Sequence, residues 1–158
     1  MEHANAIATA ALIVHSLSAV VWVGGMFFAY MVLRPSAGTL DAAARLALWA
    51  GVFERFFRWV IATIVLLLAS GYAMVIWVFG GFAWLGVHVD VMQATGIVMM
   101  LLFFHLYFAP WKRYRRAFAA GNLPEAGRQL GQIRIIVAVN LVLGLVTVAV
   151  ASSGRYWG

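Results

Sequence analysis

The sequence contains no cysteine, and only 10% of its 158 residues are charged. Without thiolates it cannot form disulfides, zinc–thiolate centres or iron–sulfur clusters, and it has no cysteine nucleophile. Its five acidic residues all lie outside the long apolar runs. Paired carboxylates for general acid–base hydrolysis are therefore missing, and proton-coupled transport on an intramembrane acid is disfavoured. The sequence also lacks a phosphate-binding glycine loop.

Hydrophobic residues, by contrast, make up 65% of the chain. A soluble domain is about 45–50% apolar and about 25% charged, so this chain has too few polar residues to cover a water-exposed globule. We therefore predict an integral membrane protein whose main partner is the lipid bilayer. Four apolar runs approach the ~20 residues that cross the hydrocarbon layer. They predict an all-α four-helix bundle, one transmembrane domain over residues 1–158, with spans at about 7–33, 59–79, 91–108 and 135–151.

The basic residues are distributed unevenly along the chain. Four lie in residues 34–58 and six in residues 112–134, so two alternate loops hold ten of the eleven. The positive-inside rule then places both loops in the cytoplasm and both termini outside, on the periplasmic side. This pattern is typical of a multi-pass protein of a bacterial-type inner (plasma) membrane. The net charge of +6 thus reports topology, and nucleic acid is not an expected partner.

Residues 41–58 keep helical periodicity, with Arg45, Glu54 and Arg55 among apolar residues. Two interpretations fit: an interfacial helix lying on the membrane, or a cytoplasmic extension of the second span. Further along, Gly121, Asn122 and Pro124 predict a turn before the fourth span.

His15 is the one ionisable side chain in the apolar stretch from His15 to Phe28, and an unpartnered imidazole is costly there. At about 100° per residue it shares a helix face with Ser18, Trp22 and Gly25. It is either a metal or haem-iron ligand, or a structural histidine bonded to a neighbouring helix.

The depth of each residue in the membrane follows from its distance along the helix from the inner surface, at about 1.5 Å per residue. Arg34 and Arg58 are among the residues that mark this surface. These depths separate the polar intramembrane residues into two layers, roughly 18 Å apart, which is too far for one haem to join both. The outer layer comprises His15, Met74, Met92 and Gln93, with His88 above them. The inner layer is the pair His105 and Asn140.

Each of these residues has a functional and a structural interpretation. The methionines are Cu(I) or axial haem ligands, or apolar filler. His88 with Asp90 is an outward-facing metal site, or a solvated loop in which Asp90 caps the third helix. His105 with Asn140 is a second cofactor or proton-relay site, or an interhelical hydrogen bond.

Three stretches resemble known families. His15, Trp22 and the run Gly25–Met26–Phe27 are similar to the first helix of CopD-like (copper resistance D) membrane proteins and of HemJ-type protoporphyrinogen oxidases. The run from Arg116 to Asn122 resembles the end of the third helix in both groups, and Ile133 to Ala151 resembles the last helix of short CopD-like proteins. HemJ-type proteins carry a lysine early in the third helix, where this chain has Met92 and Gln93.

The resemblance implies copper resistance or uptake in the first family, and b-type haem with porphyrinogen oxidation in the second. The missing lysine disfavours porphyrinogen oxidase activity. We rank a small membrane redox protein slightly first, with haem b bound through His15 and Met92 or His88 as second ligand, beside Trp22 and Gly25. It would act in electron transfer or as an oxidoreductase on a lipid-soluble or porphyrin substrate, with a redox partner or quinone.

Two other hypotheses stay open. The first is a CopD-like copper-binding or transport protein that uses His15, Met74, Met92 and His88. The second is a non-catalytic membrane subunit whose polar residues only fix helix packing. The sequence does not decide whether the protein forms a homo-oligomer.

Overall fold

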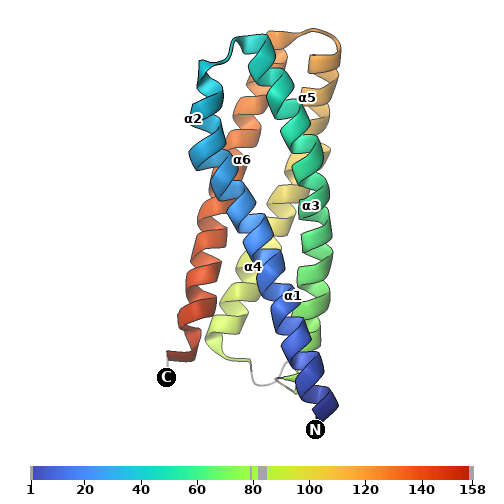
Figure 1. Cartoon of the computed structure of the whole chain (residues 1–158), viewed down its shortest axis with the longest axis vertical. Coiled ribbons are helices and arrows are strands. Elements are labelled where there is room, and N and C mark those ends of the chain that lie inside the picture. Colours follow the sequence, from blue (N-terminus) through green and yellow to red (C-terminus); the bar gives the residue numbers. More distant parts are fainter. Residues whose placement is uncertain (1, 79, 82–84, 157–158) are drawn as a thin grey trace.

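The computed structural model describes residues 2–78, 80–81 and 85–156 as an elongated bundle of helices (Figure 1). All regular elements among these residues are helical. In chain order they are α1 (Glu2–Phe27), the π-helical η1 (Phe28–Leu33), α2 (Arg34–Ser36), η2 (Ala37–Thr39), α3 (Ala42–Trp77), α4 (Val87–Phe108), α5 (Pro110–Ala119), α6 (Leu123–Ser153) and η4 (Gly154–Tyr156).

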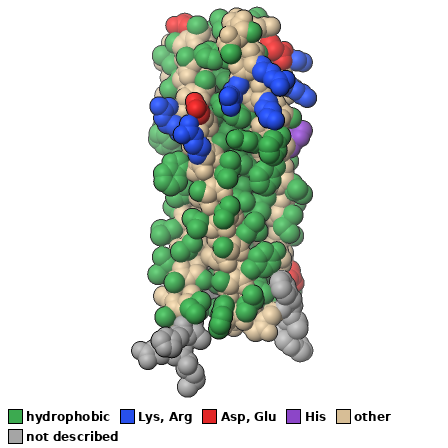
Figure 2. Space-filling view, turned by 90° about the vertical axis from the view of Figure 1, so that its right-hand side faces the viewer, with side chains coloured by type: hydrophobic (Ala, Val, Ile, Leu, Met, Phe, Trp, Pro, Cys, Tyr) green, Lys and Arg blue, Asp and Glu red, His purple; other side chains and the backbone are tan. Residues whose placement is uncertain are grey.

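Four helical stretches are long and apolar enough to cross a membrane: Asn5–Thr39, Ala42–Trp77, Val87–Ala119 and Leu123–Ser153. The predicted all-α membrane fold with four spans is thereby confirmed. Both chain termini lie at the same end of the bundle, on opposite sides of it in the view of Figure 1, and we call this the terminal end. Basic side chains gather toward the other end, above a broad apolar surface (Figure 2), and we call it the basic end. Which side of the membrane each end faces stays a prediction.

The segment 41–58 and the second span form one continuous helix, α3. The Asp41 side chain caps its start by accepting a hydrogen bond of 2.9 Å from the backbone N–H of Ala44. At 1.5 Å per residue, its 36 residues extend for roughly 54 Å. That length exceeds the hydrocarbon thickness of about 30 Å, so the first turns of α3 extend beyond the apolar layer.

The loop between α5 and α6 is a compact turn. Gly121 has φ of +70°, which glycine adopts without strain. The Asn122 N–H bonds the Ala117 carbonyl and the Gly121 N–H bonds the Phe118 carbonyl, which together form a Schellman motif. Asn122 then caps α6 by accepting from the N–H of Glu125 at 3.1 Å. The turn predicted from Gly121, Asn122 and Pro124 therefore has a clear backbone basis.

The start of α4 differs from the sequence-based expectation. The helix begins at Val87 with Gly86 as the residue before it, so Asp90 is inside the first turn and is not the N-cap. The reason is that Gly86 accepts backbone bonds from both Val89 and Asp90, which starts the helix earlier. Asp90 still stabilises this helix end, because its negative charge faces the positive pole of the helix dipole.

Packing divides the bundle into two helix pairs. α1 packs chiefly against α3, and α4 with α5 packs chiefly against α6. An aromatic cluster near the basic end joins the pairs: Phe57 of α3 contacts Phe103 of α4 and Trp111 of α5, edge to face, with ring centroids 5.6 and 5.5 Å apart. The buried Tyr114 hydroxyl adds a 2.6 Å hydrogen bond to the Leu46 carbonyl of α3. These contacts fix one end of the bundle and leave the terminal end to polar contacts between helices.

Close packing of α1 against α3 depends on Gly25. A Cβ atom at this position would overlap the ring of Phe56, whereas a Cβ at the neighbouring Gly24 would meet nothing within 4 Å. We therefore expect Gly25→Ala to lower the free energy of unfolding by about 1–3 kcal/mol through overpacking. Gly24→Ala is the matched control and should keep or slightly raise stability. Thermal unfolding of both variants in detergent measures the difference, and equal stabilities would contradict it.

Candidate functional site

His15 lies half-buried on the side of α1 that faces α3. Its Nδ1 atom is 3.0 Å from the hydroxyl oxygen of Ser70 on α3. This hydrogen bond links residues 55 positions apart in the chain and joins these two helices within the apolar layer. The imidazole therefore has the partner that a membrane interior requires.

The Ser70 hydroxyl determines which ring nitrogen of His15 carries the hydrogen. Its single hydrogen is donated to the Leu66 carbonyl of its own helix, at 2.5 Å. Ser70 must therefore accept from His15, and Nδ1 is the donor. We assign the Nδ1–H tautomer on this basis, which leaves the lone pair on Nε2.

Gly71 provides the space in which the ring is seated. A Cβ atom at Gly71 would lie 3.3 Å from Cε1 and 3.6 Å from Nδ1 of His15. Nε2 is not among the atoms within 4 Å of that position, so the Cε1–Nδ1 edge faces α3 and Nε2 points away from Gly71. A hydrogen bond that holds one ring nitrogen and orients the other is the usual arrangement around a metal-ligating histidine.

Met74 is the predicted site residue whose position relates most directly to His15. It is half-buried and follows Ser70 by four residues, so both lie on one face of α3. That face is turned toward α1, because Ser70 on it is hydrogen-bonded to His15 of α1. Met74 is thus one helical turn from Ser70, toward the terminal end. Its long, flexible thioether side chain can extend along the helix over that turn, toward His15.

His88 and Met92 lie on α4, which packs against α6 and not principally against α1. The ring of His88 fills the space above two glycines: a Cβ at Gly154 would overlap it, and a Cβ at Gly86 would lie 2.7 Å from its Cε1. His88 is therefore seated at the junction of α4 with η4. The described contacts join neither His88 nor Met92 to His15, so a single site that includes all three stays a prediction.

Trp22 and Gly25, the other motif residues of the first span, have packing roles in the structure. Trp22 is 3% exposed and its ring meets Phe103 of α4 edge to face, with centroids 6.3 Å apart. Gly25 receives the Phe56 ring of α3. The stripe that begins at His15 therefore lies along the contacts of α1 with α3 and α4, and its role beside a cofactor is untested.

The inner pair, His105 and Asn140, is not joined by a hydrogen bond in the described part of the chain. Asn140 is buried, and its Nδ2 donates to the Met99 carbonyl of α4 at 3.1 Å. His105 is exposed on the outside of α4. The side chains of Asn140 and His105 do not meet, because Asn140 of α6 faces α4 inside the bundle, whereas His105 lies on the outer side of α4. Asn140 makes the interhelical bond itself, with backbone as its partner.

Sequence reasoning missed Ser70, the residue that holds His15. A serine in an apolar helix commonly bonds the carbonyl four residues back, so it carries no signal of its own. The adjacent pair Ser70–Gly71 was the available indication, since small residues in spans mark close helix approach. The interhelical bond from Thr147 of α6 to Thr95 of α4, 2.7 Å long, was missed for the same reason.

The donor set and the cavities limit what the site can hold. Among the described residues, His, Asp and Glu side chains do not form a group of three that could hold a metal ion. A metal at His15 would therefore need ligands of other kinds, of which thioether sulfur is one. Two cavities are described, and both lie at the basic end: one of about 20 Å³ lined by Arg34 and Arg134 among others, and an open groove beside Lys112 and Arg116.

In a comparison with known families, residues 50–153 match the family model described as "Copper resistance protein D". The matched region includes most of α3 and all of α4, α5 and α6, and so contains Ser70, Met74, His88 and Met92, while His15 precedes it. The chain matched no curated protein and no solved structure.

The tautomer of His15 is directly measurable. We expect nitrogen NMR on protein with isotope-labelled histidine to find His15 protonated at Nδ1, because Ser70 can only accept there. Ser70→Ala should shift the ring toward the Nε2–H form, whereas Ser16→Ala, at an exposed serine of α1, should not. His15→Asn identifies the signal. An Nε2–H ring in the unmodified protein would contradict the assignment.

Proposed function

The chain belongs to the copper resistance protein D family, and from this premise we propose that it binds and handles copper in the membrane as Cu(I). The family description names copper, and it matches two thirds of the chain. The chain supplies ligand types that Cu(I) accepts, imidazole and thioether, and no thiolate. In this proposal copper is the substrate of the protein and not a resident catalyst.

His15 is the principal ligand in this proposal, and the observation that carries it is the hydrogen bond from its Nδ1 to Ser70. That bond orients the ring and leaves Nε2 with a free lone pair, as a metal ligand requires. A histidine with only a packing role would gain as much from either nitrogen. The ring also lies over Gly71, where an added Cβ atom would be 3.3 Å from its Cε1, and this close fit together with the hydrogen bond preorganises the imidazole.

Met74 is the proposed second ligand, because it lies one turn from Ser70 on the face of α3 that meets α1. The pair combines one imidazole and one thioether, both neutral. A neutral donor set suits a monovalent cation inside an apolar layer, since it adds no uncompensated charge of its own. His88 and Met92, four residues apart on α4, repeat the same combination near the terminal end and are the proposed site of first capture.

Haem b bound through His15, with redox activity toward a quinone or porphyrin, is the alternative that the sequence ranked first. We now place it second, because the family description names copper. The likeness to HemJ-type proteins and a homo-oligomeric state remain predictions.

Metal analysis and an absorption spectrum of the purified protein test the proposal. We expect about one Cu(I) per chain after loading under reducing conditions. His15→Ala should reduce this to below about one tenth, and Ser70→Ala should weaken Cu(I) affinity by about tenfold as the loss of an outer hydrogen bond does. Met74→Leu should weaken it as well, with the fold unchanged.

His105→Ala is the matched control, because it removes an exposed imidazole of the same bundle and should leave copper binding unchanged. Competition with a Cu(I) chelator measures each affinity. A Soret band that disappears in His15→Ala would overturn the copper proposal in favour of haem. Full copper binding in His15→Ala would overturn the assignment of the ligand.

A further inference from the structure

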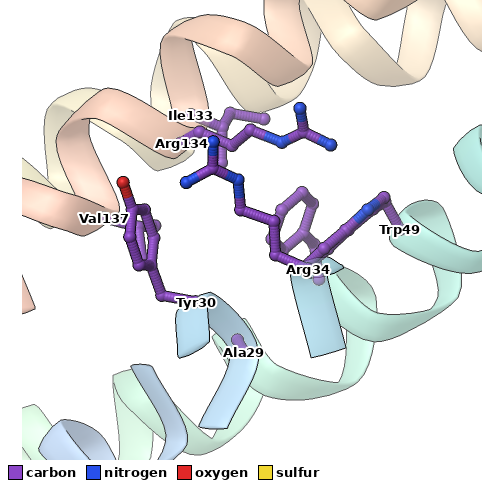
Figure 3. Close-up of a pocket in the computed structure, with 8 residues that line it drawn as sticks. Ala29, Tyr30, Arg34, Trp49, Ile133, Arg134 and Val137 are labelled. Carbon is purple, nitrogen blue, oxygen red and sulfur yellow. The ribbon is translucent and has the colours of Figure 1, made fainter. Parts of the chain in front are cut away.

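The basic end of the bundle contains a small cavity between three helices. Tyr30 of η1, Arg34 of α2, Trp49 of α3 and Arg134 of α6 all line it, and its volume is about 20 Å³. Figure 3 shows both guanidinium groups in the space between α6 and the helices that carry Tyr30 and Trp49. A cavity of this size holds roughly one water-sized group, so it admits an oxygen atom and not a large ligand.

Aromatic rings support the two arginines at this cavity. The Cζ atom of Arg34 lies 4.8 Å from the centre of the Tyr30 ring, and that of Arg134 lies 6.0 Å from the centre of the Trp49 ring. Arginine stacked on aromatic rings keeps its planar N–H donors in a fixed direction. The arrangement therefore holds two positive groups, from α2 and α6, around one opening.

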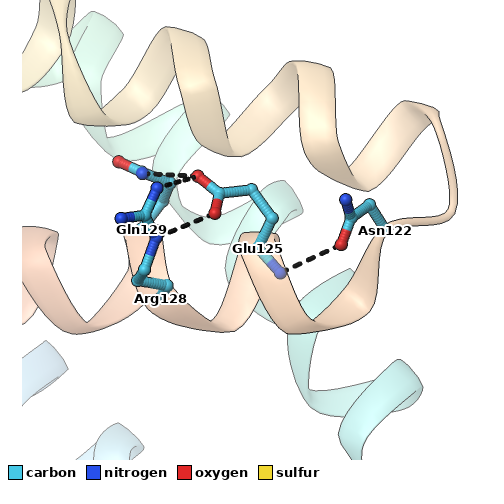
Figure 4. A network of polar contacts seen from close by, with 4 residues as sticks. All are labelled: Asn122, Glu125, Arg128 and Gln129. Carbon is cyan, nitrogen blue, oxygen red and sulfur yellow. Dashed lines mark hydrogen bonds and ion pairs between the residues drawn. The ribbon is translucent and has the colours of Figure 1, made fainter.

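The charge of these arginines is not balanced by carboxylates. Arg134 is repelled by the charges of Arg34 and Arg45. The three acidic residues at this end are already engaged: Asp41 caps α3, Glu54 pairs with Arg58 at 3.0 Å, and Glu125 pairs with Arg128 at 2.8 Å and accepts from Gln129 (Figure 4). The described part of the basic end thus offers these guanidinium groups no anionic partner.

Two buried donors at the same place also lack partners. The Nε atom of Arg134 and the indole Nε1 of Trp49 are both buried without a hydrogen bond in the described residues. Buried N–H groups are nearly always satisfied, and each exception in a native protein needs a physical explanation, of which a bound water or ion is one. The positive-inside rule explains why arginines lie at this end. It does not explain why two arginines without carboxylate partners lie beside buried N–H groups that have no hydrogen bond.

We propose that Arg34 and Arg134, with Trp49, form a binding site for a phosphate group. A phosphate oxygen in the cavity would accept from the buried donors, and the remaining oxygens would face the guanidinium forks, whose geometry matches phosphate. The site lies where the apolar run of the first span ends, beside aromatic residues typical of the membrane interface. The phosphate comes from an anionic phospholipid headgroup or from solution. The site does not depend on the copper proposal.

The test uses the full chain, purified in detergent and delipidated, with thermal unfolding as readout. One arm adds inorganic phosphate, with chloride at equal ionic strength as reference. The other compares nanodiscs of phosphatidylglycerol with nanodiscs of phosphatidylcholine. We expect a rise of about 2–4 °C in at least one arm, since a ligand that binds only the folded state stabilises it. A rise only with phosphatidylglycerol identifies the lipid as the source, and a rise only with inorganic phosphate identifies the free anion.

Variants decide whether the effect belongs to this site. The double variant Arg34→Gln/Arg134→Gln should lose the rise, and Arg34→Gln alone, at an exposed position that does not endanger folding, should lose most of it. Arg55→Gln is the matched control, because it removes an exposed positive charge from α3 at the same end, outside the cavity. The proposal is overturned if neither arm shows a rise, if the rise persists in Arg34→Gln, or if Arg55→Gln loses it equally.

Discussion

The hydrogen bond between His15 and Ser70 shows the constraint on which the whole structure depends: inside the membrane a polar group must find its partner within the protein. The bundle meets this constraint with a few interhelical bonds. His15 and Ser70 join α1 to α3, while Asn140 bonds the Met99 carbonyl and so joins α6 to α4. Apolar side chains gain little by leaving lipid for other apolar side chains, so such bonds and close packing determine how the helices align.

Glycines make the same contacts geometrically feasible. Gly71 lets the His15 ring approach the backbone of α3, and Gly25 lets the Phe56 ring approach the backbone of α1. At Gly144 of α6, an added Cβ would lie 2.8 Å from Val23 of α1 and 3.2 Å from Met99 of α4, so three helices meet there. Small residues and polar side chains therefore act together: the glycine brings two helices close enough for the adjacent hydrogen bond to form.

The fold could be predicted from the sequence because the bilayer dictates it. Four runs of sufficient length and apolarity leave few alternatives to four spans.

The partner of His15 could not be predicted, since that required the vertical alignment of α1 and α3. Taking Arg34 and Arg58 as equal in depth was wrong: the antiparallel pairing of His15 with Ser70 places Arg34 opposite Gly51, seven residues or roughly 10 Å from Arg58. The cavity shared by Arg34 and Trp49 agrees with this alignment. Composition carries no information about such an offset, because α3 continues without a break through its charged first turns.

The two ends of the bundle have opposite electrostatic character, and this relates the two proposals. Around His15 and Met74 the available ligands are neutral, which suits a monovalent cation in an apolar layer. A cation that moved from there toward the basic end would meet the positive charges of the exposed Arg34 and the partly buried Arg134, which would both repel it. Their unpaired charges alone would therefore oppose the passage of Cu(I). A phosphate group bound between them would neutralise that field, so the occupancy of the site at the basic end would set the barrier for an ion held at His15. If both proposals hold, the neutral ligands of the copper site and the two arginines of the phosphate site would lie at different depths of one bundle, and an ion held at His15 would meet less electrostatic repulsion toward the terminal end than toward the basic end.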